Sequence, residues 1–438
     1  MAMMSGAAET KIRPLQPTNA SLSGTKFYIF PLILITCLFF LWGMANNLND
    51  ILIRQFKKAF ELSDFQSGLV QSAFYLGYFV LALPAAYVMR RFSYKTGIVI
   101  GLVLYAAGAF LFVPAADSGT YGFFLFALFV IASGLAFLET AANPYVSVLG
   151  TPETASFRLN LAQAFNPIGC VTGIVVGQQF IFSGIEHSKE TLARMTPQAL
   201  KAYYLSESSA VKIPYLCIGI VVILFAVLVL LTRFPVVKDE EEESENAKSG
   251  EGKFGILKIR HFRLAVLAQF FYVGGQVCIW SFLIRYIQHN LPGTPEKAAA
   301  NYLIISLVIF TAGRFVGTAL LKKVKDHLLL AIYAIASMLL VALAVLLPGT
   351  IGLWALVLTS FFMSIMYPTI FTLGISGLGR QAKLGSSVIV MAIIGGAVLT
   401  ALMGKLSDVT GITTAMAIPL LAFAVVAFYG LKGYKKTA

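Results

Sequence analysis

Three ionisable side chains stand out in this sequence because each lies within a long run of apolar residues. Asp50 ends the polar cluster "MANNLND", Glu139 lies in "ASGLAFLETAANPYVSVLG", and Arg314 lies in "FTAGRFVGTALLKK". A charged side chain at the middle of a lipid bilayer costs about 2.5–3.5 kcal/mol on insertion scales. Because residues of this kind usually bind, couple ions or pair helices, each of the three is a candidate functional residue.

The cluster around Asp50 contains more polar groups than a helix end requires. On a helix, Trp42, Asn46, Asn49 and Asp50 share one face, with Asn47 beside it. This face cannot be turned toward lipid, so it either fills a buried network between helices or lines a water-filled cavity. Asp50 could also simply mark the end of the helix. The neighbouring amides favour the cavity, because a carboxylate at a helix end does not need them.

Glu139 and Arg314 each admit a functional and a structural interpretation. Small residues surround Glu139, and Pro144 follows Asn143, which together favour close helix packing and a loosened backbone. These features are typical of a gating or substrate-contacting helix, although Glu139 could also be a structural carboxylate tied to a neighbouring helix. Arg314 could staple adjacent helices or contact the substrate, and the sequence leaves both open.

Neutral polar and aromatic residues mark further interior positions in the same apolar runs. They are Asn160, Gln163, Asn166, Gln276, Trp280 and Tyr367. Amides, a carboxylate and aromatic rings together suit a sugar, which offers hydroxyl groups to polar partners and apolar C–H faces to rings. A carrier of peptides or nucleotides would be expected to have more basic residues in its core. The residue types therefore favour a monosaccharide as the ligand.

The composition requires a membrane environment for these elements. The chain has 438 residues, of which 58% are hydrophobic and 12% charged, whereas a soluble domain has about 25% charged residues. The net charge of +13 comes from short loops and predicts membrane orientation and not nucleic-acid binding. The four cysteines lack CxxC spacing, so neither a disulfide framework nor a metal site is expected. The absence of P-loop, GxSxG and HExxH motifs argues against an enzyme.

Apolar segments of about 20 residues, the length that crosses a bilayer, predict an all-α protein with twelve transmembrane helices. The predicted spans are 27–50, 67–89, 97–116, 121–142, 161–183, 213–233, 264–287, 300–320, 327–348, 351–375, 386–406 and 412–431. A hydrophilic segment divides them into two pseudo-symmetric bundles of six helices. The expected domains are an amino-terminal tail 1–26, a first bundle 27–235, a charged linker 236–263, a second bundle 264–431 and a tail 432–438.

The placement of Lys and Arg predicts the orientation of these spans. With the amino terminus in the cytoplasm, most of the 33 Lys and Arg residues fall in cytoplasmic loops and tails. Both tails and the linker are therefore expected to be cytoplasmic. The group Arg54, Lys57 and Lys58 is an exception to the rule, since it falls on the outer side.

Seven stretches of the sequence resemble one group of membrane carriers. They are "FLWGMANNLNDILI", "QSAFYLGYF", "FLETAANPYVSVLG", "FRLNLAQAFN", "IWSFLIRY", "GRFVGTAL" and "MYPTIFTLGI". Together with "GSSVIVMAIIGGA" they resemble the fucose:proton symporters of the major facilitator superfamily, by pattern nearest to the bacterial L-fucose permeases. A related branch carries glucose and galactose, in some members with sodium, and usually has another residue where this chain has Glu139. The basic loop between the second and third spans, "MRRFSYKTG", departs from the superfamily pattern, which leaves its usual gating contact open.

The resemblance implies a major facilitator fold that works by alternating access, with named roles for several positions. In such carriers the aspartate of "NNLND", here Asp50, is tied to proton coupling, and the glutamate of "ETAANP", here Glu139, to both proton and sugar. The positions matching sugar-site amides and cavity aromatics are Asn47, Gln163, Trp42, Trp280 and Tyr367. Asn46, Asn143, Gln276 and Arg314 complete the expected substrate contacts.

We therefore expect proton-driven import of L-fucose or a close analogue such as galactose or arabinose. A carboxyl group facing a wet vestibule can lose its proton, whereas enclosure between the bundles penalises its charged form. The expected setting is a bacterial cytoplasmic membrane, with a monomer as the working unit and no cofactor beyond the co-transported proton, sodium being the alternative ion. The alternative functions are a sodium-coupled glucose/galactose carrier and a drug efflux pump.

Overall fold

The computed structural model describes residues 23–60, 62, 64–149, 151–181, 191, 194–234 and 255–435, and over this part of the chain it consists of helices and their connections. Most of the predicted tail 1–26, most of the linker 236–263 and the last three residues lie outside the described residues. So do the side chains of some helical residues, including Asn46, Asn47 and Asp50. The predicted domain boundaries therefore stay predictions.

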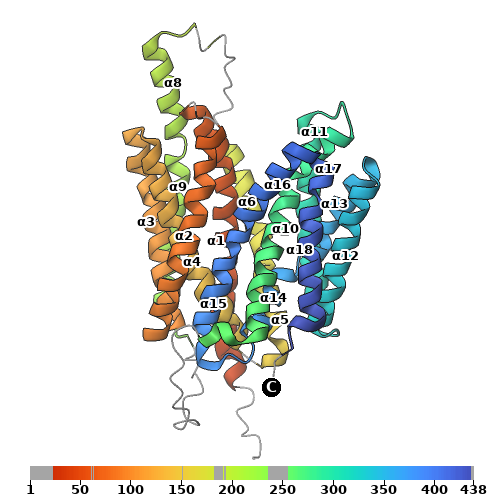
Figure 1. Cartoon of the computed structure of the whole chain (residues 1–438). Coiled ribbons are helices and arrows are strands. Elements are labelled where there is room, and N and C mark those ends of the chain that lie inside the picture. The colour runs from red at the N-terminus through yellow and green to blue at the C-terminus, as the bar shows by residue number, and fades with distance from the viewer. Residues whose placement is uncertain are drawn as a thin grey trace, which may run out of the picture.

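The first half of the chain supplies the helices on the left of Figure 1 and also α5, which is labelled at the bottom, just right of the middle. They are α1 (Ser23–Ala59), α2 (Asp64–Arg91), α3 (Tyr94–Ser118), α4 (Tyr121–Val148), the 3-10 turn η1 (Pro152–Thr154), α5 (Ala155–Gln163), α6 (Phe165–Phe180), α8 (Pro197–Ser209) and α9 (Lys212–Leu231). Helices α5 and α6 follow each other with one residue between them and form the fifth predicted span.

The second half supplies the helices on the right of Figure 1, and α15 lies near the middle of the view. They are η2 (Gly255–Lys258), α10 (Arg260–Asn290), α11 (Glu296–Leu320), α12 (Asp326–Leu346), α13 (Thr350–Met363), α14 (Met366–Ile375), η3 (Gly379–Gln381), α15 (Ala382–Met391), η4 (Ala392–Ile394), α16 (Gly395–Thr410), α17 (Ile412–Ala415), α18 (Ala417–Phe428) and the π-helical turn η5 (Tyr429–Gly433).

Two hydrophobic cores hold the molecule together, one centred on each half of the chain. Ten helical segments among the described residues are long and apolar enough to cross a membrane. Helix α1 and the pair α5–α6 complete the twelve spans that the sequence predicts. The prediction of an all-α membrane protein with two six-helix bundles is confirmed by this architecture.

Several predicted spans are interrupted, and proline explains two of the breaks. Pro167 follows the junction of α5 and α6, and Pro368 follows the junction of α13 and α14. Proline has no N–H, so the carbonyl four residues earlier loses its helical donor. The carbonyls concerned belong to Gln163 and Ser364. Within α4, Pro144 has the same effect on the carbonyl of Thr140.

Glycines allow α1 and α6 to pack with their backbones in contact. A Cβ atom added at Gly43 would overlap the carbonyl oxygen of Asn166, and one added at Gly169 would overlap that of Phe40. Small residues permit this close approach between membrane helices. The packing fixes α6, and α5 before it, against the segment of α1 that carries Trp42.

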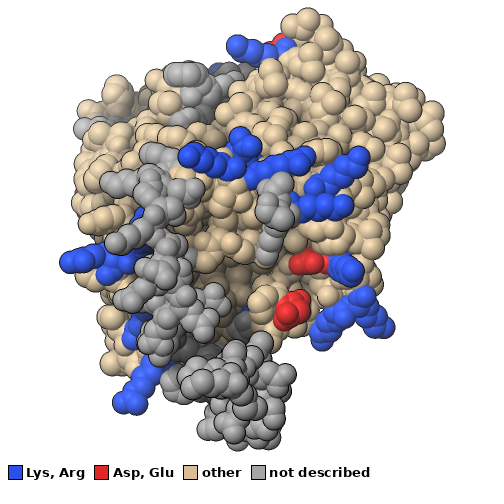
Figure 2. Space-filling view, turned by 60° about the horizontal axis from the view of Figure 1, so that its bottom comes forward, with Lys and Arg blue, Asp and Glu red and all other residues tan. Residues whose placement is uncertain are grey.

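We call the end of the molecule at which α5, α12 and α15 begin the lower end, after its place in Figure 1. Figure 2 shows this end turned toward the viewer, with Lys and Arg side chains spread over it and few Asp or Glu side chains among them. An excess of Lys and Arg is the property that the cytoplasmic side of a membrane protein usually has.

Candidate functional site between the two bundles

The carboxyl group of Glu139 lies at the interface of the two bundles. Its side chain is 0% exposed on α4. One oxygen, Oε1, accepts a hydrogen bond from the hydroxyl of Tyr367, which belongs to α14 of the other bundle. The second oxygen, Oε2, is buried and has no hydrogen-bond partner among the described residues. Glu139 therefore joins the bundles through one oxygen, while the other lies buried in the interface.

A chain of amides continues from Glu139 toward the second bundle. Asn143 lies one turn after Glu139 on α4, and its Oδ1 accepts a hydrogen bond of 2.9 Å from Gln163 Nε2. The Oε1 atom of Gln163 accepts in turn from Arg314 on α11, at 3.2 Å. The amide nitrogen of Asn143 lies beside the Glu139 carboxyl and reaches hydrogen-bond geometry with none of the described residues. Three predicted site residues are thus brought together beside Glu139.

Arg314 is bound by carbonyls that proline has released from their helices. Its Nε donates to the carbonyl of Ser364 at 2.6 Å, and its NH1 donates to the carbonyl of Gln163 at 3.2 Å. The guanidinium carbon also lies 4.9 Å from the centre of the Phe310 ring. These contacts satisfy a buried cation through neutral oxygens and an aromatic face. They correspond to the interpretation in which Arg314 links neighbouring helices, and a contact of Arg314 with substrate stays a prediction.

Trp280 is oriented by hydroxyl groups of its own bundle. Its Nε1 donates to Ser360 Oγ at 3.1 Å, and Ser360 shares a further hydrogen bond with Ser306. The indole packs edge-on against Phe310, with ring centres 5.1 Å apart. Gln276 lies four residues earlier on α10, so both side chains project from the same helix face. Both are half-buried.

Trp42 and one residue outside the predicted set complete the aromatic side of the site. Trp42 is half-buried on α1, and its Nε1 has no hydrogen-bond partner among the residues that the structure describes. Tyr78 on α2 lies close enough to Trp42 and Glu139 to interact with both, and its buried hydroxyl is in hydrogen-bond geometry with no described side chain or backbone group. Sequence reasoning missed Tyr78 because a tyrosine in an apolar run is usually a packing residue. Its position in "QSAFYLGYF" was the available signal.

The amides and carboxylate of the opening cluster lie on α1, whose backbone is described. The helix continues to Ala59, nine residues beyond Asp50, so the alternative in which Asp50 marks the helix end is wrong. The physical reason is that the polar cluster is followed by further helix-forming residues that pack into the core, including Leu52 and Phe56. The side chains of Asn46, Asn47 and Asp50 lie outside the described residues, and their roles stay predictions.

At the lower end, side chains of α5 form hydrogen bonds with residues of the second bundle. On α5, Ser156 Oγ donates to Asp326 Oδ2 at 2.8 Å and lies 2.6 Å from Thr372 Oγ1. One turn further, Asn160 Nδ2 donates to Thr369 Oγ1 at 3.2 Å. These five residues therefore link the two bundles by hydrogen bonds between polar side chains.

Helix α15 makes the corresponding contacts with α4 and α2. Ser386 Oγ donates to the carbonyl of Thr140 at 3.1 Å, the carbonyl that Pro144 leaves without its helical donor. Ser387 Oγ donates to the carbonyl of Ala82 at 2.6 Å. Both serines are 0% exposed. The bundles are thus joined at the lower end by side chains of both α5 and α15.

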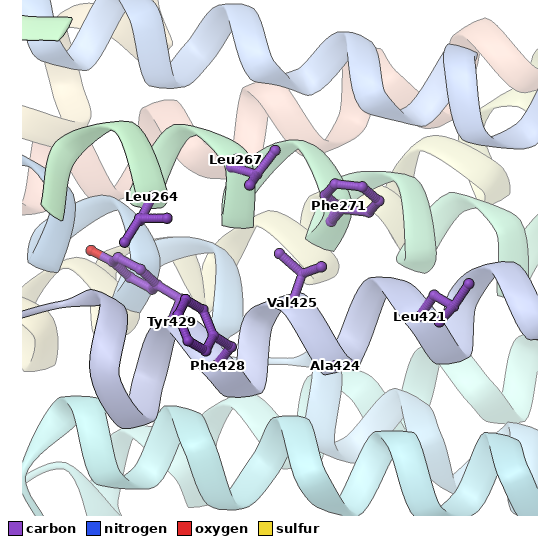
Figure 3. A pocket seen from close by; sticks show the side chains of 8 residues that line it. All are labelled: Leu264, Leu267, Phe271, Leu421, Ala424, Val425, Phe428 and Tyr429. Atoms are coloured by element: carbon purple, nitrogen blue, oxygen red, sulfur yellow. The ribbon is translucent and has the colours of Figure 1, made fainter. Parts of the chain in front are cut away.

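An apolar groove on the second bundle is distinct from this site. It has a volume of about 470 Å³ and is lined by Leu264, Leu267, Phe271, Leu421, Ala424, Val425, Phe428 and Tyr429. Figure 3 shows these side chains between two helices of the second bundle, with the Tyr429 hydroxyl as the visible oxygen. Because its lining offers almost no hydrogen-bonding groups, the groove does not suit a sugar.

Comparisons with known proteins identify the family. Residues 32–392 match the family model described as Major Facilitator Superfamily. The chain belongs to the major facilitator superfamily. Within it, the chain is 49% identical over 405 residues to the L-fucose-proton symporter of Escherichia coli K12, covering 92% of each chain. It is 38% identical to the Glucose/galactose transporter of Brucella abortus biovar 1, over 97% of this chain and 99% of that protein.

A solved structure agrees with this assignment. The crystal structure of the major facilitator transporter FucP in the outward conformation superposes with a TM-score of 0.86. The two chains are 49% identical, and the match covers 94% of this chain and 100% of that one. The predicted resemblance to fucose:proton symporters and the predicted major facilitator fold are confirmed. Membership in a transporter family also confirms that the protein is not an enzyme.

Proposed function

We propose that this protein imports a monosaccharide, L-fucose or a close analogue such as galactose or arabinose, together with protons. The observation that carries the proposal is the buried carboxyl of Glu139, bonded across the bundle interface to Tyr367, in a chain 49% identical to an L-fucose-proton symporter. A carboxyl group in this position can bind a proton, a sugar hydroxyl, and the opposite bundle.

Glu139 couples proton and sugar because its charge state changes the cost of enclosing it. When the site is open to water the carboxylate is solvated, and when the bundles enclose it the charged form is penalised. Passage between the two states is therefore favoured when Glu139 is protonated. A sugar hydroxyl bonded to the same group makes proton binding and sugar binding depend on each other. Asp50 is proposed as the second proton site on α1.

The proposed sugar site combines the amides and aromatics that the two bundles present toward each other. Its members are Glu139, Asn46, Asn47, Asn143, Gln163, Trp42, Trp280, Gln276, Tyr367 and Arg314. The amides bind hydroxyl groups and the indoles stack on the C–H face of the ring. Transport of the sugar needs no prosthetic group, because the proton gradient supplies the driving force.

The proposed setting is the cytoplasmic membrane of a bacterium, with the lower end and both chain termini in the cytoplasm. The Lys and Arg side chains at the lower end support this orientation. With the lower end cytoplasmic, the contacts of α5 and α15 close the site toward the cell interior, and the sugar enters from outside. We propose a monomer as the working unit.

A second candidate is a carrier of glucose and galactose that uses sodium. The relative named as a Glucose/galactose transporter, 38% identical over 97% of this chain, supports this alternative substrate. A sodium carrier would use Asp50 and Glu139 as oxygen ligands for the ion instead of as proton sites. Nothing in the described residues favours a drug efflux pump, so that alternative is not proposed further.

The decisive experiment is a counterflow panel of labelled monosaccharides in vesicles, measured across pH and with or without sodium. We expect exchange of L-fucose that depends on pH and not on sodium. Asp50→Ala should abolish uphill accumulation, Asp50→Asn should keep exchange without gradient dependence, and Glu139→Ala should lose sugar binding as well. Accumulation of sugar against a gradient by Asp50→Ala cells would rule out proton coupling through Asp50.

A further inference from the structure

Tyr78 lies on the face of α2 that is turned toward the second bundle. Residues 75, 78 and 82 share one helix face. The Tyr75 hydroxyl lies against Gly396 of α16, and the Ala82 carbonyl accepts from Ser387 of α15. Tyr78 is placed between these two contacts, so its side chain projects into the same interface as Glu139.

The hydroxyl of Tyr78 is buried and forms no hydrogen bond with the described residues, although it lies among groups that could form one. The side chain is 4% exposed, it interacts electrostatically with Glu139, and Trp42 Nε1 faces its hydroxyl without reaching hydrogen-bond geometry. Trp42 Nε1 and Glu139 Oε2 are likewise buried without a partner in the part of the chain that the structure describes. Buried polar atoms in native proteins are almost always satisfied, because an unsatisfied donor or acceptor is costly. Three such atoms from α1, α2 and α4 therefore indicate a place where a polar ligand binds.

The three groups have complementary hydrogen-bonding capacities. The indole of Trp42 can only donate, the Tyr78 hydroxyl can donate and accept, and Glu139 accepts when ionised and can donate when protonated. A hydroxyl group also donates and accepts at once. Two adjacent hydroxyls on a sugar ring could satisfy all three atoms in either charge state of Glu139, whereas an apolar ligand could not and an anionic one could only with Glu139 protonated.

We propose that the Tyr78 hydroxyl binds a ring hydroxyl of the transported sugar and selects its orientation, next to Glu139 and Trp42. This inference rests on the proposed function and adds a residue that its sugar site does not contain. The proposal predicts that Tyr78 contributes to sugar specificity more than to the proton requirement, since its hydroxyl is not a proton carrier at neutral pH.

The test compares Tyr78→Phe with a matched control, Tyr429→Phe. Tyr429 is 1% exposed and its hydroxyl also lacks a partner within the described ranges, but it lies in η5 beside the apolar groove. Binding of L-fucose, of D-galactose, and of their monodeoxy analogues is measured on the purified proteins by calorimetry. We expect Tyr78→Phe to weaken binding of the natural sugar about three- to tenfold, in the range of one neutral hydrogen bond.

The monodeoxy analogues identify the hydroxyl concerned. For one analogue the wild-type protein and Tyr78→Phe should bind equally, because the partner of Tyr78 is already absent, whereas the other analogues should keep the difference. Tyr429→Phe should match the wild type throughout, and thermal melting of both variants establishes that they are folded.

Three outcomes would overturn the inference, and they differ in what else they overturn. Equal binding of every sugar by wild type and Tyr78→Phe overturns the role of Tyr78 alone. A changed pH dependence of uptake with unchanged affinity also overturns it, since Tyr78 would then serve the carboxyl of Glu139. If the wild-type protein binds neither L-fucose nor D-galactose nor any of their monodeoxy analogues, the proposed function is overturned, and the inference with it.

Discussion

Alternating access requires the lower end to open in every transport cycle, and a covalent link between α5 and α14 should stop it. Ser156 and Thr372 come from opposite bundles, and their hydroxyl oxygens are 2.6 Å apart. Replacing both by cysteine places two sulfurs where a bond of about 2.0 Å needs only a small shift. The oxidised Ser156→Cys/Thr372→Cys variant should be locked with its lower end closed.

The hydrogen bonds of Ser156 indicate how much the two substitutions destabilise the closed lower end before any disulfide forms. Ser156 donates to the carboxylate of Asp326 and bonds to Thr372. A hydrogen bond to a charged group contributes about 1.5–3 kcal/mol and a neutral one about 1 kcal/mol. Losing both costs the closed state about 3 kcal/mol, which lowers its population relative to the open state about a hundredfold. The reduced variant therefore opens more easily than the wild type and should still transport.

The assay is uptake of labelled L-fucose into vesicles after oxidation and again after a reducing agent. We expect uptake to fall to background when the disulfide forms and to return on reduction. The control pair is Asn290→Cys/Thr413→Cys, because Thr413 Oγ1 donates to Asn290 Oδ1 at 3.0 Å between two helices of the same bundle. Its oxidation should leave uptake unchanged. Full uptake by the oxidised Ser156→Cys/Thr372→Cys protein would refute opening at this place.

Three further predictions concern the site and its support. Glu139→Gln should reduce the pH dependence of uptake to the part that Asp50 supplies, since the amide keeps a polar contact with Tyr367 but cannot gain or lose a proton; uptake measured at several pH values checks this, and an unchanged profile would contradict it. Arg314→Lys should lower the melting temperature, because one ammonium cannot reach both proline-released carbonyls and loses about 2 kcal/mol of hydrogen bonding. Gly169→Ala should abolish folding, since its Cβ overlaps a backbone carbonyl of α1. Gly122→Ala, which has open space around it, should fold normally. The amount of folded protein extracted from membranes compares the two variants.

Part of the fold and site follows from local sequence properties alone. The twelve spans, the two halves and the membrane setting depend on the length and polarity of each segment, which a chain displays without folding. Asp50, Glu139 and Arg314 could be selected in the same way, because a charge in an apolar run is costly wherever the run packs. The family resemblance then supplied their expected roles, which the described residues do not test.

Only the tertiary structure decided which groups meet. Whether Arg314 has structural partners depends on two carbonyls released by Pro167 and Pro368, from helices far apart in sequence, and no periodicity within α11 predicts them. The unsatisfied hydroxyl of Tyr78 is equally invisible in the sequence, where it reads as one more aromatic residue in an apolar helix. Hydrogen bonds between bundles depend on the relative position of whole helices, and that position results from packing the complete chain.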